Sequence, residues 1–152
     1  MSNYNITLAD LSDIEIVAQM FDLYRQFYQQ QPDIELATDF ISTRMKNKES
    51  IIFIVRNGVG KSMGFCQLYP SFCSVEAIRI YVLYDLFVLP EYRRSGVARK
   101  LLKMSEEHAK LNHIGRMDLS TAKNNMAAQA LYESLGWVRD DIFFAYSWYD
   151  NG

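Results

Sequence analysis

Residues 85–102 read Asp85-Leu86-Phe87-Val88-Leu89-Pro90-Glu91-Tyr92-Arg93-Arg94-Ser95-Gly96-Val97-Ala98-Arg99-Lys100-Leu101-Leu102. They predict a buried strand, a tight turn with two arginines and a glycine, and a helix that begins at once. A helix start presents backbone N–H groups without partners, and the helix dipole favours an anion there. Gly96 and Ala98 leave room for a diphosphate close to the backbone. Four side chains add positive charge: Arg93, Arg94, Arg99 and Lys100. The arrangement favours a pyrophosphate-binding turn over a merely solvated basic helix start.

Upstream of this segment the chain predicts one strand, two helices and three strands. The Asn57-Gly58 pair is a strong hairpin signal, and Tyr69-Pro70-Ser71-Phe72 predicts a further turn. The expected elements are a strand at Tyr4–Leu8, a helix capped by Asp10 and closed before Pro32, a helix at Leu36–Lys46, and strands at Ile51–Arg56, Met63–Tyr69 and Ala77–Val88.

Downstream, helices and strands alternate. The expected elements are a helix from Val97 to about Asn112, a strand at Arg116–Ser120, a helix at Met126–Leu135 stopped by Gly136, and strands at Trp137–Arg139 and Ile142–Trp148. This order implies one α+β domain over residues 1–152 with a mixed sheet.

Composition excludes several classes of function. The chain is 49% hydrophobic with a formal net charge of -2, which argues against a nucleic-acid-binding surface. No run reaches the roughly 18 apolar residues that a membrane span needs. Cys66 and Cys73 match no zinc or redox spacing, and His108 and His113 lack companion ligands, so we expect no metal. The polar start Met1–Asn5 has no signal-peptide pattern, so we expect a cytoplasmic protein.

A second signature lies at residues 125–137, which read Asn125-Met126-Ala127-Ala128-Gln129-Ala130-Leu131-Tyr132-Glu133-Ser134-Leu135-Gly136-Trp137. Together with the first segment it resembles the GNAT superfamily of N-acetyltransferases. Arg93, Gly96 and Ala98 match the family's coenzyme A motif Arg/Gln-x-x-Gly-x-Gly/Ala. The second stretch looks like Asn-x-x-Ala-x-x-Leu-Tyr-x-x-x-Gly-Phe, with Trp137 in place of the usual Phe. The resemblance covers the chain from about Ile51 onward.

The resemblance implies a mixed, mostly antiparallel sheet of six to seven strands, flanked by about four helices. A parallel pair, Ala77–Val88 and Arg116–Ser120, would splay apart and hold acetyl-CoA. The residues implied in cofactor binding are Leu86, Phe87 and Val88 through their backbone, then Arg93, Arg94, Ser95, Gly96, Val97, Ala98, Arg99, Asn125 and Ala128. The side chains of Leu86, Phe87 and Val88 also suit the core, and Asn125 equally suits a helix N-cap.

Two residues are candidates for catalysis. The resemblance places Tyr132 near the acetyl sulfur, where a phenol can protonate the departing thiolate; the alternative is packing within its helix. Asp85 interrupts an apolar strand beside the expected reaction centre, and burial there would raise its pKa towards that of a useful base. Relatives of the polyamine acetyltransferase type often carry Glu-Asp where this chain has Tyr84-Asp85. Asp85 is therefore either the base or a structural carboxylate.

The acceptor site is expected among aromatic side chains, which can hold a cationic amine by cation–π attraction. Its candidates are Tyr24, Phe27, Tyr28, Tyr69 and Tyr81, with Asp33, Glu35 and Asp39 as attracting acids. The expected reaction is direct transfer of an acetyl group from acetyl-CoA to a primary amine of a small molecule or peptide, because neither motif contains a cysteine nucleophile. Another acyl group, or a non-catalytic acetyl-CoA sensor, stays open.

A homodimer is the family's implication for assembly. The apolar ending Ile142–Tyr149 is compatible with an interface between copies and equally with a central strand inside one chain.

Overall fold

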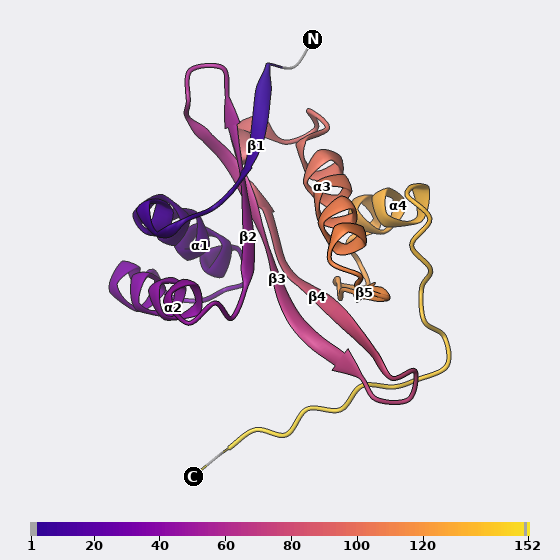
Figure 1. Cartoon of the computed structure of the whole chain (residues 1–152). Coiled ribbons are helices and arrows are strands. Elements are labelled where there is room, and N and C mark those ends of the chain that lie inside the picture. Colours follow the sequence, from indigo (N-terminus) through magenta and orange to yellow (C-terminus); the bar gives the residue numbers. More distant parts are fainter. Residues whose placement is uncertain (1–2, 151) are drawn as a thin grey trace. The chain divides into compact units, whose positions relative to one another are not determined.

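The computed structural model describes residues 3–150 and residue 152 (Figure 1). They form two compact units, one ending at Ser120 and one beginning at Thr121. The elements are β1 (Tyr4–Leu8), the short 3-10 helix η1 (Leu11–Asp13), α1 (Ile14–Phe27), α2 (Ile34–Lys46), β2 (Ile51–Asn57), β3 (Ser62–Cys73), β4 (Ile78–Val88), the 3-10 helix η2 (Pro90–Tyr92), α3 (Val97–Leu111), β5 (Arg116–Asp118) and α4 (Met126–Ser134).

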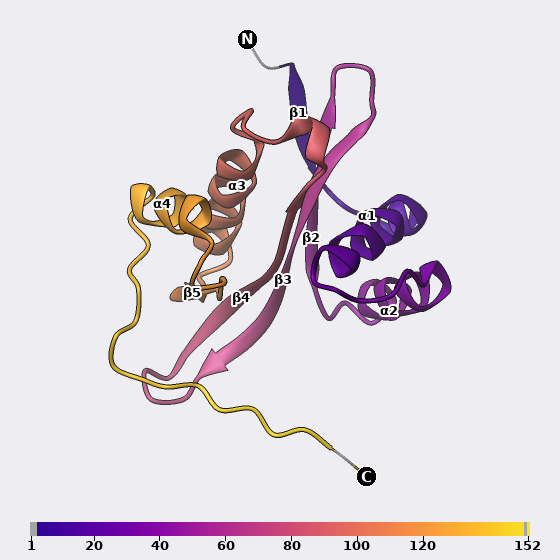
Figure 2. The same cartoon turned by 180° about the vertical axis from the view of Figure 1, so that it is seen from behind.

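The first unit is built on a five-stranded sheet in the order β1-β2-β3-β4-β5. The first three pairings are antiparallel, and β4 pairs with β5 in parallel. Helices α1 and α2 cover one face of this sheet and α3 covers the other, as the two opposite views agree (Figures 1 and 2). The expected α+β class, mixed and mostly antiparallel sheet, and four helices are confirmed.

The core beneath α1 and α2 follows from the apolar spacing of the two helices and the alternation of the strands. Its members are Val17, Met20, Phe21, Ala37, Ile41, Ile52, Ile54, Phe65 and Phe87. Full burial of one such side chain contributes about 1.5–3 kcal/mol, so this cluster holds both helices on the sheet.

Both N-terminal helices begin at aspartates. Asp10 forms a capping box with Asp13 around η1, and α1 follows directly. Asp33 accepts a hydrogen bond of 3.1 Å from the Leu36 amide, so α2 begins at Ile34, two residues before the predicted start. The side-chain oxygen replaces a partner that the first helical turn lacks.

The predicted turn at Tyr69–Phe72 is wrong, because β3 continues to Cys73 and pairs with β4 through this stretch. Proline normally interrupts a strand because it has no N–H to donate. Here β2 begins at Ile51 opposite Leu68, so at Pro70 one edge of β3 lies beyond the end of β2. A proline is tolerated at such an edge.

The six to seven strands expected are also wrong: the sheet has five, and neither Trp137–Arg139 nor Ile142–Trp148 is a strand. Within its described residues the second unit contains α4 and no strand. The carboxylate of Asp140 accepts hydrogen bonds from the amides of Ile142 (3.1 Å) and Phe143 (3.3 Å). This local turn uses amides that a ladder would need, and an isolated segment without a neighbouring strand is not stable as one.

Candidate active site

The carboxyl end of β4 extends past its parallel neighbour. The ladder with β5 runs only from Ile80↔Arg116 to Val82↔Asp118, so within the described residues β4 continues to Val88 after that pairing has ended. The Leu89 amide donates a hydrogen bond of 2.9 Å to the Met63 carbonyl on the β3 side. Backbone groups alternate in direction along a strand.

By that alternation Leu86 and Val88 direct their N–H and C=O groups to the open edge, whereas Phe87 faces β3. The carbonyl of Phe87 lies so close to β3 that a Cβ added to Gly64 would meet it at 2.5 Å. Of the three backbones predicted to pair with an amide-containing arm, two therefore point to the open edge and one does not.

A β-bulge turns Asp85 towards α1. Gln67 pairs with Asp85 and Leu68 pairs with Leu83, so Tyr84 is an extra residue in β4. Tyr81 contacts His108 of α3, and strict alternation would direct Asp85 to the same face. The extra residue reverses this, so Asp85 lies on the face that α1 and α2 cover.

Asp85 lies in a chain of buried polar groups. It is 3% exposed and accepts a hydrogen bond of 2.5 Å from Nε2 of Gln67, which is 0% exposed. Oε1 of Gln67 in turn accepts a hydrogen bond of 2.7 Å from the Ser50 hydroxyl. Burial raises the pKa of Asp85, while the hydrogen bond from Gln67 and the nearby hydroxyl of Tyr24 partly offset that rise. A carboxyl group with a raised pKa is suited to accept and release a proton near neutral pH.

Tyr24 of α1 lies over the bulge. Its hydroxyl donates a hydrogen bond of 3.1 Å to the backbone carbonyl of Tyr84, the extra residue of the bulge. Burial, with the negative charge of Asp85, raises the pKa of Tyr24, so the phenol stays protonated. Its ring contacts Tyr28 edge to face at 5.1 Å, and Tyr69 contacts Tyr84 in the same manner at 5.8 Å. These tyrosines form an aromatic surface next to Asp85.

The predicted acceptor residues are brought together in part. At the end of α1, the ring of Tyr28 contacts the rings of both Tyr24 and Phe27. Tyr69 is connected to this group through Tyr84, whose ring it contacts and whose backbone carbonyl accepts the hydrogen bond from Tyr24. Tyr81 does not, because its hydroxyl lies 3.3 Å from Nδ1 of His108 on the opposite face of the sheet.

Arg93 joins the turn after β4 to this aromatic surface. Its Nε donates a hydrogen bond of 2.9 Å to the Val88 carbonyl. Its guanidinium lies 5.4 Å from the ring centroid of Phe27 and 5.6 Å from that of Phe87. Arg93 therefore ties the turn to the end of β4 and to α1 through directed contacts, a role that its charge alone does not predict.

The start of α3 has the geometry expected for an anion site. Gly96 is the N-cap residue, with a φ of 82°, and Arg94 also has a positive φ of 63°. Lys100 is the first helical residue whose amide bonds back, to Gly96 oxygen at 3.2 Å. The amides of Val97 and Ala98 precede it in the first turn, where no intrahelical acceptor exists. A Cβ added to Gly96 would meet no heavy atom within 4 Å, so the space beside its Cα is open. A helix start with such open space is suited to an anion.

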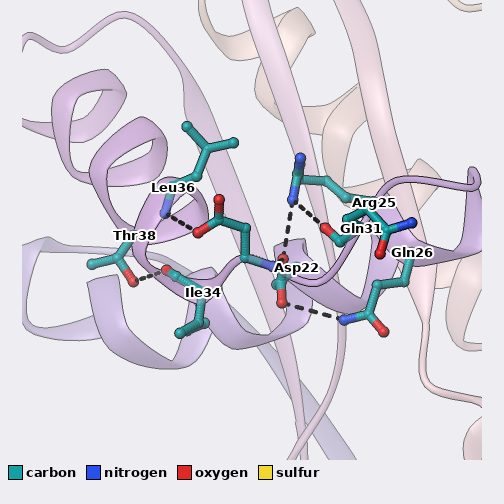
Figure 3. Close-up of polar contacts among 8 residues, drawn as sticks. Asp22, Arg25, Gln26, Gln31, Ile34, Leu36 and Thr38 are labelled. Carbon is teal, nitrogen blue, oxygen red and sulfur yellow. Dashed lines mark hydrogen bonds and ion pairs between the residues drawn. The ribbon is translucent and has the colours of Figure 1, made fainter.

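The connection between α1 and α2 is held by Asp22, as Figure 3 shows. This buried carboxylate accepts hydrogen bonds from Arg25 (3.1 Å), Gln26 (3.2 Å) and the backbone amide of Asp33 (3.1 Å). Arg25 also donates to the Gln31 carbonyl at 3.4 Å. The contacts tie the segment after α1 back onto the helix that carries Tyr24, Phe27 and Tyr28.

Sequence reasoning missed Asp22, Ser50 and Gln67. A signal existed for Gln67, since it is a single amide inside the apolar run Gly64–Leu68. Asp22 was detectable as an acid next to Phe21 on the apolar side of its helix. Ser50 carried no signal, because its role depends on a partner 17 residues away.

The second unit places the second signature around α4. Asn125 is the N-cap of α4, and its side-chain oxygen accepts a hydrogen bond of 3.2 Å from the Ala128 amide. Of the two roles predicted for Asn125, cofactor contact and helix N-cap, the structure shows the N-cap. The ring centroids of Tyr132 and Trp137 lie 6.3 Å apart. The Trp137 amide also donates a hydrogen bond of 3.0 Å to the Tyr132 carbonyl. Gly136, with a φ of 89°, ends the helix between them.

The described residues contain neither a candidate metal centre nor a candidate membrane-spanning helix. No group of three or more His, Cys, Asp or Glu side chains among them could hold a metal ion. None of the helices in this part of the chain has both the length and the apolar content to cross a bilayer. The Asp33 carboxylate, predicted to attract a cation, is used as a helix cap.

Known proteins resemble this chain closely in sequence and in fold. The model of the acetyltransferase (GNAT) family matches residues 17–137. The uncharacterized N-acetyltransferase YhfO of Bacillus subtilis is 40% identical over 142 residues, which cover 93% of this chain and 95% of that protein. A crystal structure of a probable acetyltransferase is similar with a TM-score of 0.90 and 36% identity, over 97% of this chain and 99% of the other.

A more distant solved structure shares the fold. It is described as a predicted acetyltransferase with acetyl-CoA from Clostridium acetobutylicum, with a TM-score of 0.77 and 15% identity over 95% of this chain and 96% of that one. The family match spans both motifs of the sequence and most of the chain. The chain therefore belongs to the GNAT family of acetyltransferases.

Proposed function

We propose that this chain transfers an acetyl group from acetyl-CoA to a primary amine of a small molecule or a peptide, by direct transfer in a ternary complex. The observation that carries the proposal is the joint presence, at one end of β4, of a strand edge at Leu86 and the Val88 amide that pairs with no other strand among the described residues, and of a helix start at Gly96 that is suited to an anion. An amide-containing arm pairs with the first, and a diphosphate suits the second. The family neighbour solved with acetyl-CoA supports the same donor.

The residues of the loop would each have a simple part. Val97 and Ala98 would donate their backbone amides to the diphosphate, Gly96 would allow its close approach, and Arg94 would add charge. Ser95, Arg99, Asn125 and Ala128 complete the set that the family resemblance assigns to the cofactor. Arg93 would act by holding the loop against Val88, as its hydrogen bond indicates.

Acetyl-CoA, when bound, supplies an acetyl carbon activated as a thioester. Asp85 accepts the proton that the acceptor ammonium must lose before its nitrogen can attack. Because Asp85 is 3% exposed, this proton reaches it through an intervening hydroxyl or water. The new N–C bond would form as the C–S bond breaks, and Tyr132 would donate its phenolic proton to the departing sulfur. The second proton of the attacking nitrogen would then return to the Tyr132 oxygen, which restores the phenol.

Tyr24, Phe27, Tyr28 and Tyr69 would line the acceptor site, since their rings gather on one face of the sheet near Asp85. The face of an aromatic ring attracts an ammonium group, and the raised pKa of Tyr24 keeps its hydroxyl a donor. Tyr81 does not belong to this proposal because it faces α3.

A thiol-release assay with acetyl-CoA and a panel of amines tests the proposal. We expect turnover with at least one amine, and a loss of about tenfold or more in kcat for Tyr132→Phe with acetyl-CoA binding retained. Tight acetyl-CoA binding without thiol release for any amine would instead favour a non-catalytic acetyl-CoA sensor.

The proposal extends to the organisation of the chain. The family match crosses the boundary at Ser120, which supports one acetyltransferase domain over residues 1–152. We also propose a homodimer, supported by the exposed apolar ending in which Phe144 and Tyr146 are 90% and 93% exposed. Light scattering of the native chain and of a Phe144→Ser, Tyr146→Ser variant tests this; a monomeric native chain would exclude it.

A further inference from the structure

Gln67 is an unusual residue for the centre of a sheet. It is 0% exposed, and its neighbours Phe65, Cys66 and Leu68 are all fully buried and apolar or weakly polar. Burying an amide without hydrogen-bond partners costs free energy, so a buried Gln is retained only where both of its ends are satisfied. Here both are, by Asp85 at one end and Ser50 at the other.

The partners determine which way the amide points. An ionised carboxylate only accepts hydrogen bonds, so Asp85 requires the Nε2 end of Gln67. The opposite end is then Oε1, which only accepts, so the Ser50 hydroxyl must donate. Donation therefore runs in one direction, from Ser50 to Gln67 to Asp85. A rotated amide would present Oε1 to the carboxylate and repel it.

Asp85 belongs to none of the ion pairs formed among the described residues. Among the described ionisable groups, Tyr24 of α1 and Tyr69 of β3 lie on the same face as Asp85 and feel its charge, as does Cys66 of β3 from the opposite face, where its sulfur lies against Ser105. Arg44 of α2 acts on Tyr69. The ionised carboxylate thus depends on neutral polar groups, of which Gln67 contributes most and the nearby Tyr24 hydroxyl next.

We propose that Gln67 and Ser50 are positioning residues for Asp85: Ser50 anchors the Gln67 amide by donating to its Oε1, and that amide holds the carboxylate charged and aimed along the face that carries Tyr24. The inference rests on the proposed function, in which Asp85 is the general base. It assigns the reactivity of the base to a residue on the neighbouring strand and to a serine just before β2.

The test measures the titration of Asp85 directly and through activity. Carboxyl ¹³C chemical shifts of the labelled native chain, with Asp85 assigned by Asp85→Asn, give its pKa without substrate. The acid limb of the pH profile of kcat/KM for the amine gives the pKa of the same group during catalysis. Both are recorded for the native protein, Gln67→Met, Ser50→Ala and Ser50→Thr. Ile52→Val is the control, because Ile52 pairs with Gln67 across β2 and β3 and changes packing without changing this hydrogen-bond chain.

A hydrogen bond to a charged group contributes enough that its loss moves a pKa by about one unit. We expect Gln67→Met to shift the Asp85 titration and the acid limb upward by about that amount. Ser50→Ala shifts both in the same direction by less, Ser50→Thr restores the native values, and Ile52→Val leaves them unchanged. A merely structural role would lower activity at every pH without moving the limb.

An Asp85 titration that stays in place in Gln67→Met and Ser50→Ala overturns the inference. If Gln67→Met does not fold, the comparison of Ser50→Ala with Ser50→Thr decides alone, because threonine keeps a hydroxyl that can donate to Gln67 and alanine does not. If the ¹³C titration moves and the acid limb does not, the positioning chain is confirmed and the general-base role of Asp85 is overturned. The failure of the inference and that of the proposed function are thus distinguishable.

Discussion

Nε of Arg93 donates a hydrogen bond of 2.9 Å to the carbonyl oxygen of Val88, five residues earlier in the chain. The bond closes the turn between β4 and α3 on itself and leaves the guanidinium within 5.4 Å of the ring centroid of Phe27. The turn that begins the proposed anion site is therefore shaped by a directed contact of an arginine, and not only by the local sequence.

Replacing this arginine by lysine tests that contact. Arg93→Lys keeps the charge and removes both the Nε donor and the planar group that stacks on Phe27. We expect the Kd for acetyl-CoA, measured by calorimetry, to rise by about tenfold, the effect of one lost directed hydrogen bond. Arg94→Lys is the matched control and changes the Kd by about twofold or less, because Arg94 would act through charge alone. Equal effects of the two substitutions would contradict this role.

Gly96→Ala tests the open space at the helix start. The residue has a φ of 82°, so alanine introduces backbone strain of about 1 kcal/mol in the free energy of unfolding. No heavy atom of the chain lies within 4 Å of the added Cβ, so packing contributes no further loss. Acetyl-CoA binding is expected to weaken by at least tenfold, since the methyl group occupies the approach of the diphosphate. Gly60, also with positive φ and open space, is the control: Gly60→Ala costs similar stability and leaves binding unchanged.

Asp85→Asn tests the burial of a charge. Burial raises the native pKa of Asp85 above its ordinary value of 3.8, so the folded chain binds this proton more tightly than the unfolded chain does. The stabilising effect of the proton is complete below 3.8 and is lost as the pH rises through the native pKa. Each unit by which the pKa is raised corresponds to about 1.4 kcal/mol.

In urea titrations the variant should therefore be more stable than the native chain at pH 7, and the difference should vanish near pH 3. A native chain that gains stability relative to Asp85→Asn as the pH rises would show that the carboxylate is held by stronger partners than Gln67 and Tyr24.

Asp22→Ala tests the contacts that hold the segment between α1 and α2. It removes the acceptor for Arg25, Gln26 and the Asp33 amide and leaves a partly buried guanidinium unpaired. We expect a loss of about 2 kcal/mol in the free energy of unfolding and a raised KM for the amine. The control, Glu49→Ala, removes an exposed partner of Arg44 and costs about 0.5 kcal/mol or less. An unchanged KM in Asp22→Ala would show that this segment does not shape the acceptor site.

The two cysteines give a test of the direct-transfer mechanism. Burial raises the pKa of Cys66 to about 11, and its sulfur lies 3.4 Å from the Ser105 hydroxyl, whereas Cys73 is partly exposed. We expect a thiol reagent at pH 8 to label Cys73 in the native protein and both residues only after unfolding. The Cys66→Ala, Cys73→Ser variant should keep its kcat within about twofold, since no thiolate takes part. Loss of all activity in a folded variant would reopen a covalent route.

Much of the site was predictable because its signals are local. The turn at Arg93–Gly96, the helix start at Val97 and the N-cap at Asn125 each depend on a few consecutive residues. The same holds for most element positions, which the structure places within two residues of the predicted bounds or extends, as in β3. What failed depended on distant partners: Pro70 lies within β3 because β2 has already ended there, and Ile142–Trp148 is not a strand because Asp140 captures its first amides.

The sequence by itself determined the order of helices and strands, the positively charged turn before α3 and the two signatures of the family. These are set by side-chain periodicity, by glycine's access to positive φ and by helix capping, all of which act within a few residues. Only the tertiary structure decided which face of the sheet Asp85 occupies and which groups meet it. The bulge at Tyr84 and the partners Gln67, Ser50 and Tyr24 come from the pairing of β3 with β4 and from the packing of α1, and no local rule encodes the register between separate strands.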